Sequence, residues 1–140
     1  MPGETEMHGG DTDHRSDTIV LTMPSGPSFR GVASLVLGGV GSRLDLPFER
    51  MDDLQLAVLS MLDATEGAEA AVEIRAEEHR VGVSVGPLRP DAPADEGLAL
   101  VLRRLTDEIA ATRRDGSPWL TVYVERRRQE ADGAATPASA

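Results

Sequence analysis

The sequence predicts an α+β domain, a two-layer sandwich in which helices cover one face of a mostly antiparallel sheet. Three observations lead to this prediction. Residues 18–23 (TIVLTM) and 119–125 (WLTVYVE) are rich in β-branched and aromatic residues, which is typical of strands. Residues 71–85 contain two runs in which apolar and polar residues alternate, as expected for a hairpin. Three further segments carry apolar residues at helical spacing.

The first half of the chain is expected to form one strand and two helices. Pro24 and Gly26 end the strand over 18–23. A helix is predicted over 29–43, with its apolar residues at helical spacing: Phe29, Val32, Val36 and Val40. Pro47 suits the start of a second helix, which continues to about residue 65. The apolar stripe of that second helix consists of Leu54, Val58, Met61 and Leu62.

The second half is expected to form a hairpin, a helix and a final strand. The hairpin pairs residues 71–76 with 80–85, and residues 77–79 form its turn. The proline-rich stretch 86–96 is a predicted loop. A helix is expected over 97–114, and its apolar stripe consists of Leu98, Leu102, Leu105 and Ile109. With the strand over 119–125, the predicted order is β-α-α-β-β-α-β.

The chain of 140 residues is predicted to hold one domain, residues 18–128, between two disordered tails over 1–17 and 129–140. The first tail is acidic and polar, with no apolar core of a signal peptide. It contains residues that could chelate a metal: His8, Asp11, Asp13 and His14. A flexible tail loses conformational entropy when it orders around a metal, so we expect no metal site there.

The composition excludes several classes of function. The formal charge of −10 disfavours nucleic acid as a partner, because phosphate binding needs a basic surface. No run of apolar residues is long enough for a membrane helix, and the chain has no cysteine, so a cytoplasmic protein is expected. All basic residues other than histidine are arginines, which excludes any mechanism that needs a lysine.

Several pieces of the sequence resemble the anti-sigma-factor serine kinases of the GHKL ATPase superfamily, over about residues 18–127. The stretch 52–58 (DDLQLAV) is similar to the family's Asp-Leu-x-Leu-Ala-Val. The stretches 97–101 (GLALV) and 105–108 (LTDE) are similar to its Gly-Leu-x-Leu-Ile and Leu-x-Asp-Glu. The resemblance implies the Bergerat (histidine-kinase-like ATPase) fold. It also implies homodimerisation through the first strand and helix, and ATP and Mg²⁺ as the family's ligands.

The first nucleotide motif of that family has no counterpart here. The family carries a catalytic glutamate and, four residues later, an asparagine that ligates Mg²⁺. These positions fall on Ser60 and Ala64, and the chain contains no asparagine at all. Asp63 lies one residue away from the ligand position and would point about 100° round the helix. The resemblance therefore places no metal ligand and no catalytic residue in this chain.

The other two nucleotide motifs are also altered. The family's Asp-x-Gly-x-Gly, which binds adenine, falls on Gly86 and the two residues after it, so Leu88 replaces a glycine. In the family's Gly-x-Gly-Leu, which binds phosphate, Gly97 and Leu98 are kept but Asp95 replaces the first glycine. A carboxylate at a helix N-terminus caps the helix and repels phosphate.

These losses favour a regulatory protein-binding module, a pseudo-ATPase that controls a sigma factor or an anti-anti-sigma factor, with no cofactor. An active ATP-binding serine kinase with a rearranged pocket, using Asp63 or Glu66, is the alternative. A third hypothesis is a subunit that stabilises another ATPase-like chain.

The remaining candidate residues are given structural roles or left with two interpretations. His79 is expected on the exposed hairpin turn, so no Ser/His/Asp triad forms. Trp119 and Tyr123 are expected to share one side of the last strand and to pack in the core. The arginines at 103–104, 113–114 and 126–128 are interpreted either as solvated faces or as a contact with an acidic partner.

Overall fold

The computed structural model describes residues 17–41 and 43–126. The expected tails, including the possible metal ligands of the first, lie outside these ranges apart from Asp17. The main elements follow in chain order: β2 (Asp17–Pro24), α2 (Arg30–Gly41), α3 (Phe48–Leu62), β3 (Glu69–Ala76), β4 (Arg80–Gly86), α4 (Glu96–Leu105), β5 (Glu108–Arg114) and β6 (Ser117–Glu125). Short 3-10 helices, η2 (Pro27–Phe29) and η3 (Ala92–Ala94), precede α2 and α4.

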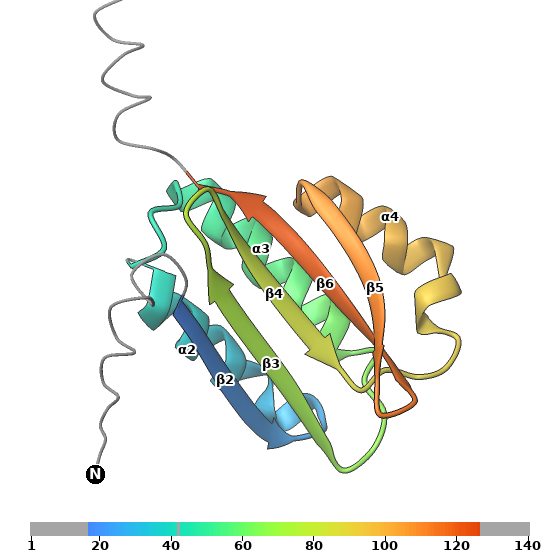
Figure 1. Ribbon diagram of the computed structural model, residues 1–140. Helices are drawn as coiled ribbons and strands as arrows, with labels where there is room; N and C mark the ends of the chain where they lie inside the picture. The colour runs from blue at the N-terminus through green and yellow to red at the C-terminus, as the bar shows by residue number, and fades with distance from the viewer. Residues whose placement is uncertain (1–16, 42, 127–140) are drawn as a thin grey trace, which may run out of the picture.

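The five strands form one sheet in the order β2-β3-β4-β6-β5, and every neighbouring pair is antiparallel. The three helices pack against one face of this sheet, behind the strands in the view of Figure 1. The predicted two-layer α+β class is therefore confirmed. The described part of the chain contains no helix that is both long and apolar enough to cross a membrane.

The predicted hairpin is confirmed, with β3 and β4 joined by a turn at residues 77–79. Its register sets Val72 opposite Val85 and Ile74 opposite Val83, all four directed toward the helices and buried. The residues between them point to the opposite face, because side chains alternate along a strand. His79 is exposed on the turn, as expected.

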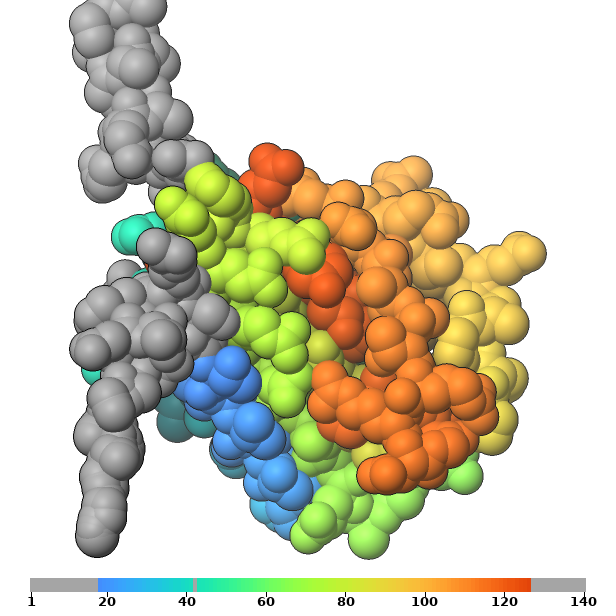
Figure 2. Space-filling model, in the orientation of Figure 1, coloured from blue at the N-terminus to red at the C-terminus, as the bar shows by residue number. Residues whose placement is uncertain are grey.

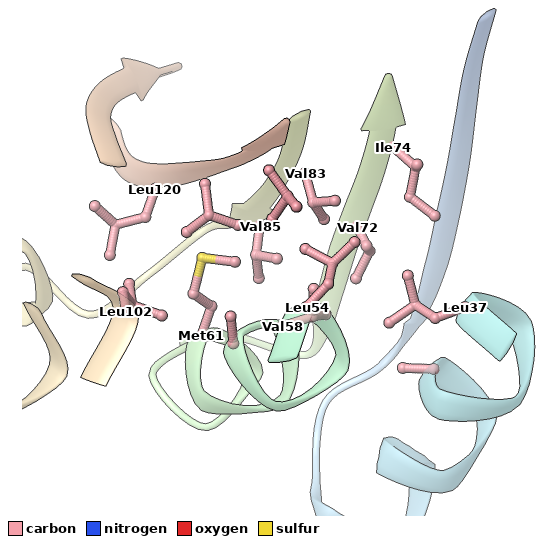
Figure 3. Packing of buried hydrophobic residues seen from close by; sticks show 14 of the residues in the cluster. Leu37, Leu54, Val58, Met61, Val72, Ile74, Val83, Val85, Leu102 and Leu120 are labelled. Atoms are coloured by element: carbon pink, nitrogen blue, oxygen red, sulfur yellow. The ribbon is translucent and has the colours of Figure 1, made fainter. Parts of the chain in front are cut away.

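The core lies between the sheet and α3 (Figure 3). Leu54, Val58 and Met61 of α3 point toward the valines of β3 and β4, which confirms most of the predicted stripe. Leu102 of α4 meets Leu120 of β6, and Leu37 of α2 lies near Ile74. Burial of these aliphatic side chains is the main stabilising term, at about 25 cal/mol per Å² of apolar surface removed from water.

Helix α2 is present but buries a different stripe from the predicted one. Ala33 and Leu37 are buried, whereas Val32 is exposed and Val36 and Val40 are only half-buried. The helix is apolar nearly all round, so helical spacing fits several overlapping stripes. The buried stripe ends in Gly41, where an added Cβ would lie 2.9 Å from Met51 Cε. Close packing against α3 therefore selects the stripe with the smaller residues.

The predicted helix over 97–114 is wrong in its second half. Helix α4 ends at Leu105, and residues Glu108–Arg114 form the edge strand β5. Thr106 already has an extended backbone, and Asp107 N donates to Tyr123 O at 2.8 Å. Pairing with β6 thus supplies the hydrogen bonds that a longer helix would have made. Asp115 and Gly116, which follow the range predicted as helix, form the two-residue turn between β5 and β6, with φ of 52° and 83°.

Candidate functional site

The segment after β4 lies against the residues that follow α3, where the family resemblance would place a nucleotide. Arg89 N donates to Ala64 O at 2.9 Å, and Glu66 N donates to Pro87 O at 2.9 Å. Leu88 N donates to Pro118 O at 2.9 Å on the other side. The Leu88 side chain is only 2% exposed and belongs to the core. Backbone hydrogen bonds and apolar burial together hold this segment in place.

Ser60 and Ala64 do not form a ligand pair. The Ser60 hydroxyl donates to Leu56 O at 2.9 Å, which satisfies its hydrogen within α3. Helix α3 ends at Leu62 rather than near residue 65, so Ala64 lies beyond the helix. Its methyl group is buried in the core and offers no ligand atom.

Gly86 lies on the opposite face of the sheet from Ala64. A Cβ added to Gly86 would lie 2.3 Å from Trp119 Cδ2, on the face that the helices leave uncovered. A longer side chain here would therefore point away from α3 and α4. The backbone after Gly86 thus lies against Ala64, but a side chain at position 86 would not face Ala64.

The N-terminus of α4 is capped by its own chain. The Asp95 side chain accepts a hydrogen bond from Leu98 N at 3.1 Å, and an added Cβ on Gly97 would lie 3.3 Å from the same oxygen. The backbone N–H that the family motif offers to phosphate is thus occupied by a carboxylate. The predicted cap is confirmed at Asp95.

Asp63 lines a separate cavity between the start of α2 and the end of α3. This cavity has a volume of about 320 Å³. Arg30 lies on its wall, with Nε 3.4 Å from Asp63 Oδ1. Ser25 also lines it, and its hydroxyl has no hydrogen-bond partner among the described residues. Glu66 is exposed and does not line this cavity, so of the two carboxylates that the alternative hypothesis could use, Asp63 is the one placed at a cavity wall.

Within residues 17–41 and 43–126 there is no group of three or more histidine, aspartate or glutamate side chains that could hold a metal ion. The family's Mg²⁺-ligand position is held by Ala64, which has no ligand atom, so the residues present do not fit the Mg²⁺ site that the family resemblance would require.

Figure 2 shows the molecule from the helix-free side of the sheet. This face carries an arrangement that the sequence analysis missed. Trp119 and Tyr123 lie on this face, over the positions of Gly86 and Gly82, and not in the core. Arg114 stacks over Trp119 at 4.1 Å and Arg80 over Tyr123 at 3.7 Å. The hydrogen bond that Arg80 Nε donates to Glu77 raises the pKa of the Arg80 guanidinium.

Core packing of the two aromatic side chains was thus the wrong expectation. They are directed outward because side chains at 119, 121 and 123 alternate with the buried 120, 122 and 124. Between the two rings, the buried Ser84 and Thr121 hydroxyls are 2.6 Å apart. Gly82 and Gly86, each two residues from Ser84, are the sequence signal that could have revealed this face. Glycine inside a strand often marks a place where another group approaches the backbone closely.

The arginines divide into paired and unpaired groups. Arg114 pairs with Glu73 at 3.0 Å, and Arg126 Nε donates to Leu44 O at 2.9 Å. Both therefore have structural roles. Arg103 and Arg104, at the end of α4, are exposed and form no ion pair within the described part of the chain.

Among the described residues, neither of the two edge strands of the sheet is paired on its outer side. Strand β5 carries Glu108, Arg113 and Arg114, whereas β2 has no charged residue over 18–24. Charged residues discourage pairing between exposed edges, so β2 is the less protected of the two. Val20 of β2 is 59% exposed, and Leu35 of the neighbouring α2 is 76% exposed.

Comparison with models of known protein families and with curated protein sequences gives no match to this chain. Its fold and site are therefore interpreted from its own residues.

Proposed function

We propose that this chain is a cytoplasmic regulatory binding protein, built on a Bergerat-type domain like that of the anti-sigma-factor serine kinases. Its partner would be a sigma factor or an anti-anti-sigma factor, which it would bind without phosphorylating. The order strand, two helices, hairpin, helix and closing strands is compatible with that family. The motif-like stretches at 52–58 and 97–101 lie in α3 and at the start of α4.

The observation that carries the proposal is the set of internal contacts where a nucleotide would bind. The segment 87–89 is hydrogen-bonded to residues on either side of it, and Leu88 is buried in the core. Asp95 accepts the Leu98 N–H that a phosphate would need. A nucleotide would have to break these contacts, and it would gain neither a metal ligand nor an adenine acceptor. Protein binding without ATP is the function that fits these contacts best.

The alternative is an active serine kinase with a rearranged pocket. The cavity beside Asp63 favours it, because Asp63, Arg30 and Ser25 all line that cavity. A carboxylate there could orient an attacking hydroxyl. Against it, Asp63 is already paired with Arg30, and the cavity lies apart from Gly97 and Gly86.

A homodimer through β2 and α2 is a second part of the proposal. The outer edge of β2, which has no charged residue over 18–24, can pair with the same edge of another copy, which would extend the sheet across both chains. Val20 and Leu35, both largely exposed here, would become covered in such a dimer.

Calorimetric titration of the full chain with Mg-ATP and Mg-ADP tests the loss of nucleotide binding. We expect no binding heat at micromolar nucleotide, with circular dichroism verifying that the protein is folded. Micromolar affinity would contradict the proposal. Asp63→Ala would then decide whether phosphotransfer depends on that carboxylate, as the kinase alternative requires.

The partner is tested by purifying a tagged chain from its own cells. Recovery of a sigma factor or an anti-anti-sigma factor, reproduced with the two purified proteins, is the expected result. Recovery of another ATPase-like subunit in constant ratio would replace the sigma-factor assignment by the role of a stabilising subunit.

A further inference from the structure

A groove runs between helix α4 and the edge strand β5, which lie beside each other in Figure 1. Its volume is about 370 Å³. Buried apolar residues line it: Ala92, Leu102 and Leu120. The half-buried side chains of Ala99 and Ile109 face it from the helix and from the strand. The groove therefore offers apolar surface to a narrow ligand.

One wall of this groove is a strand with a free edge. Strand β5 is the last in the sheet order and, within residues 17–41 and 43–126, pairs only with β6. In an antiparallel pair, alternate residues direct their N–H and C=O groups away from the partner strand. The outer edge of β5 thus presents hydrogen-bonding groups next to an apolar groove. An extended peptide can use both, with its backbone on the strand and alternate side chains in the groove.

The ion pairs around the groove leave one of its charged side chains, Arg103, available to an acidic group of a ligand. Three charged residues line it: Arg103, Asp107 and Glu108. Asp107 pairs with Arg50 at 3.0 Å and also accepts Glu125 N at 2.8 Å. Glu108 pairs with Arg80 at 3.2 Å.

Arg103, by contrast, has no ion pair within residues 17–41 and 43–126. Both carboxylates are therefore engaged in ion pairs, although each arginine is shared with a second carboxylate, Arg50 with Asp53 and Arg80 with Glu77. Arg103 is the one charged side chain lining the groove that has no ion pair among the described residues. Arg103 thus offers an unpaired positive charge in a chain whose formal charge is −10.

We propose that this groove binds an extended segment of a partner protein that adds as a strand to β5. An apolar side chain of that segment lies between Ala99 and Ile109, and a neighbouring carboxylate pairs with Arg103. This proposal specifies which kind of protein segment the binding module proposed above would recognise. It rests on that proposed function only for the assumption that the partner is a protein. It requires neither a sigma factor nor a dimer.

Fluorescence anisotropy with the full chain tests the charge preference. The probes are labelled synthetic octapeptides in which valine or leucine alternates with threonine, and one central threonine is replaced by Glu, Gln or Arg. We expect the Glu peptide to bind about two- to fivefold more tightly than the Gln peptide, the range of one exposed ion pair. The Arg peptide should bind more weakly than both.

A matched pair of charge reversals identifies the residue responsible. Arg103→Glu should invert the order of the Glu and Arg peptides. Arg104→Glu makes the same change one residue later on α4, at a side chain that does not line the groove. It should leave the order unchanged. If the two substitutions had equal effects, the preference for the Glu peptide would depend on the overall charge of the protein and not on Arg103. That result would overturn the proposal.

Two further variants test the apolar surface and the strand. Ala99→Trp fills the groove and should abolish peptide binding, whereas Leu100→Trp, on an exposed position outside this groove, should not. N-methylation of alternate amides of the Glu peptide should remove binding, because strand addition needs those donors. Circular dichroism checks that each variant is folded.

Several outcomes would overturn the inference. They are the absence of binding by every peptide, binding by the Ala99→Trp variant, or unchanged affinity of the methylated peptide. Self-association that Ala99→Trp abolishes would assign the groove to a second copy of the chain instead. None of these results bears on the nucleotide titration, so this inference can fail while the proposed function stands.

Discussion

Two glycines of β4 determine where the bulkiest aromatic side chains of the chain lie. Gly82 and Gly86 leave space on the helix-free face, and the rings of Tyr123 and Trp119 occupy it. Arg80 and Arg114 then stack on the outer faces of these rings. The face is thus covered by side chains of the sheet itself. Buried aromatic area and cation–π contact replace the second layer of helices that covers the other face.

Gly86→Ala should destabilise the protein by about 1–3 kcal/mol, because its Cβ would overlap the Trp119 ring and force it to move. Urea unfolding followed by circular dichroism measures the loss. Gly31→Ala is the matched control, since no other heavy atom lies within 4 Å of its added Cβ. That control should raise stability slightly, as expected for alanine in a helix. An unchanged midpoint for Gly86→Ala would contradict the close approach of the ring.

At the scale of elements, α4 and β5 show how a short helix is bounded at both ends. Asp95 caps the start of α4 through Leu98 N, and the Thr106 hydroxyl donates to Leu102 O at 2.7 Å at its end. The Asp107 carboxylate, which accepts Glu125 N, anchors the beginning of β5 to the end of β6. Side-chain hydrogen bonds therefore bring the chain from helix to edge strand within two residues.

Asp95→Ala should cost about 0.5–2 kcal/mol, the usual effect of losing a helix N-cap. Asp95→Asn keeps an oxygen acceptor and should retain most of the stability. Thermal and urea unfolding of the two variants and the unmodified chain would measure the difference. If alanine and asparagine proved equally stable, the hydrogen bond to Leu98 N would not contribute to the cap.

For the whole molecule, the two ends of the sheet offer different surfaces. The β2 edge has no charged residue over 18–24 and is flanked by exposed apolar residues of α2, whereas the β5 edge carries charges and borders the groove beside α4. They are separated by three other strands. A dimer contact at β2 and a peptide contact at β5 would therefore not compete for the same surface.

Val20→Lys should shift the protein toward monomer, because a charge on the exposed β2 edge opposes edge-to-edge pairing. Sedimentation velocity over a range of concentrations measures the shift. Leu56→Lys, at an exposed apolar position on α3, is the control and should leave association unchanged. A monomer at every concentration of the unmodified chain would disprove the dimer.

Much of the candidate site was readable from the sequence because it depends on which residues are missing. No asparagine exists to ligate Mg²⁺, and Ala64 has no ligand atom in any fold. The cap at Asp95 was also predictable, because capping is local. The face of the sheet toward which position 86 points could not be predicted, since it depends on the pairing of β4 with β6. The burial of Leu88 likewise depends on contacts with residues distant in sequence.

The sequence by itself determined the α+β class, four of the five strands and the starts of the helices, because these follow from local periodicity and from proline and glycine. The tertiary structure alone decided which stripe of α2 is buried, because several stripes have the same spacing. It also decided that Glu108–Arg114 is a strand, because its hydrogen bonds come from β6. Local pattern specifies period and apolarity, but only the neighbouring element decides which side of a segment is covered.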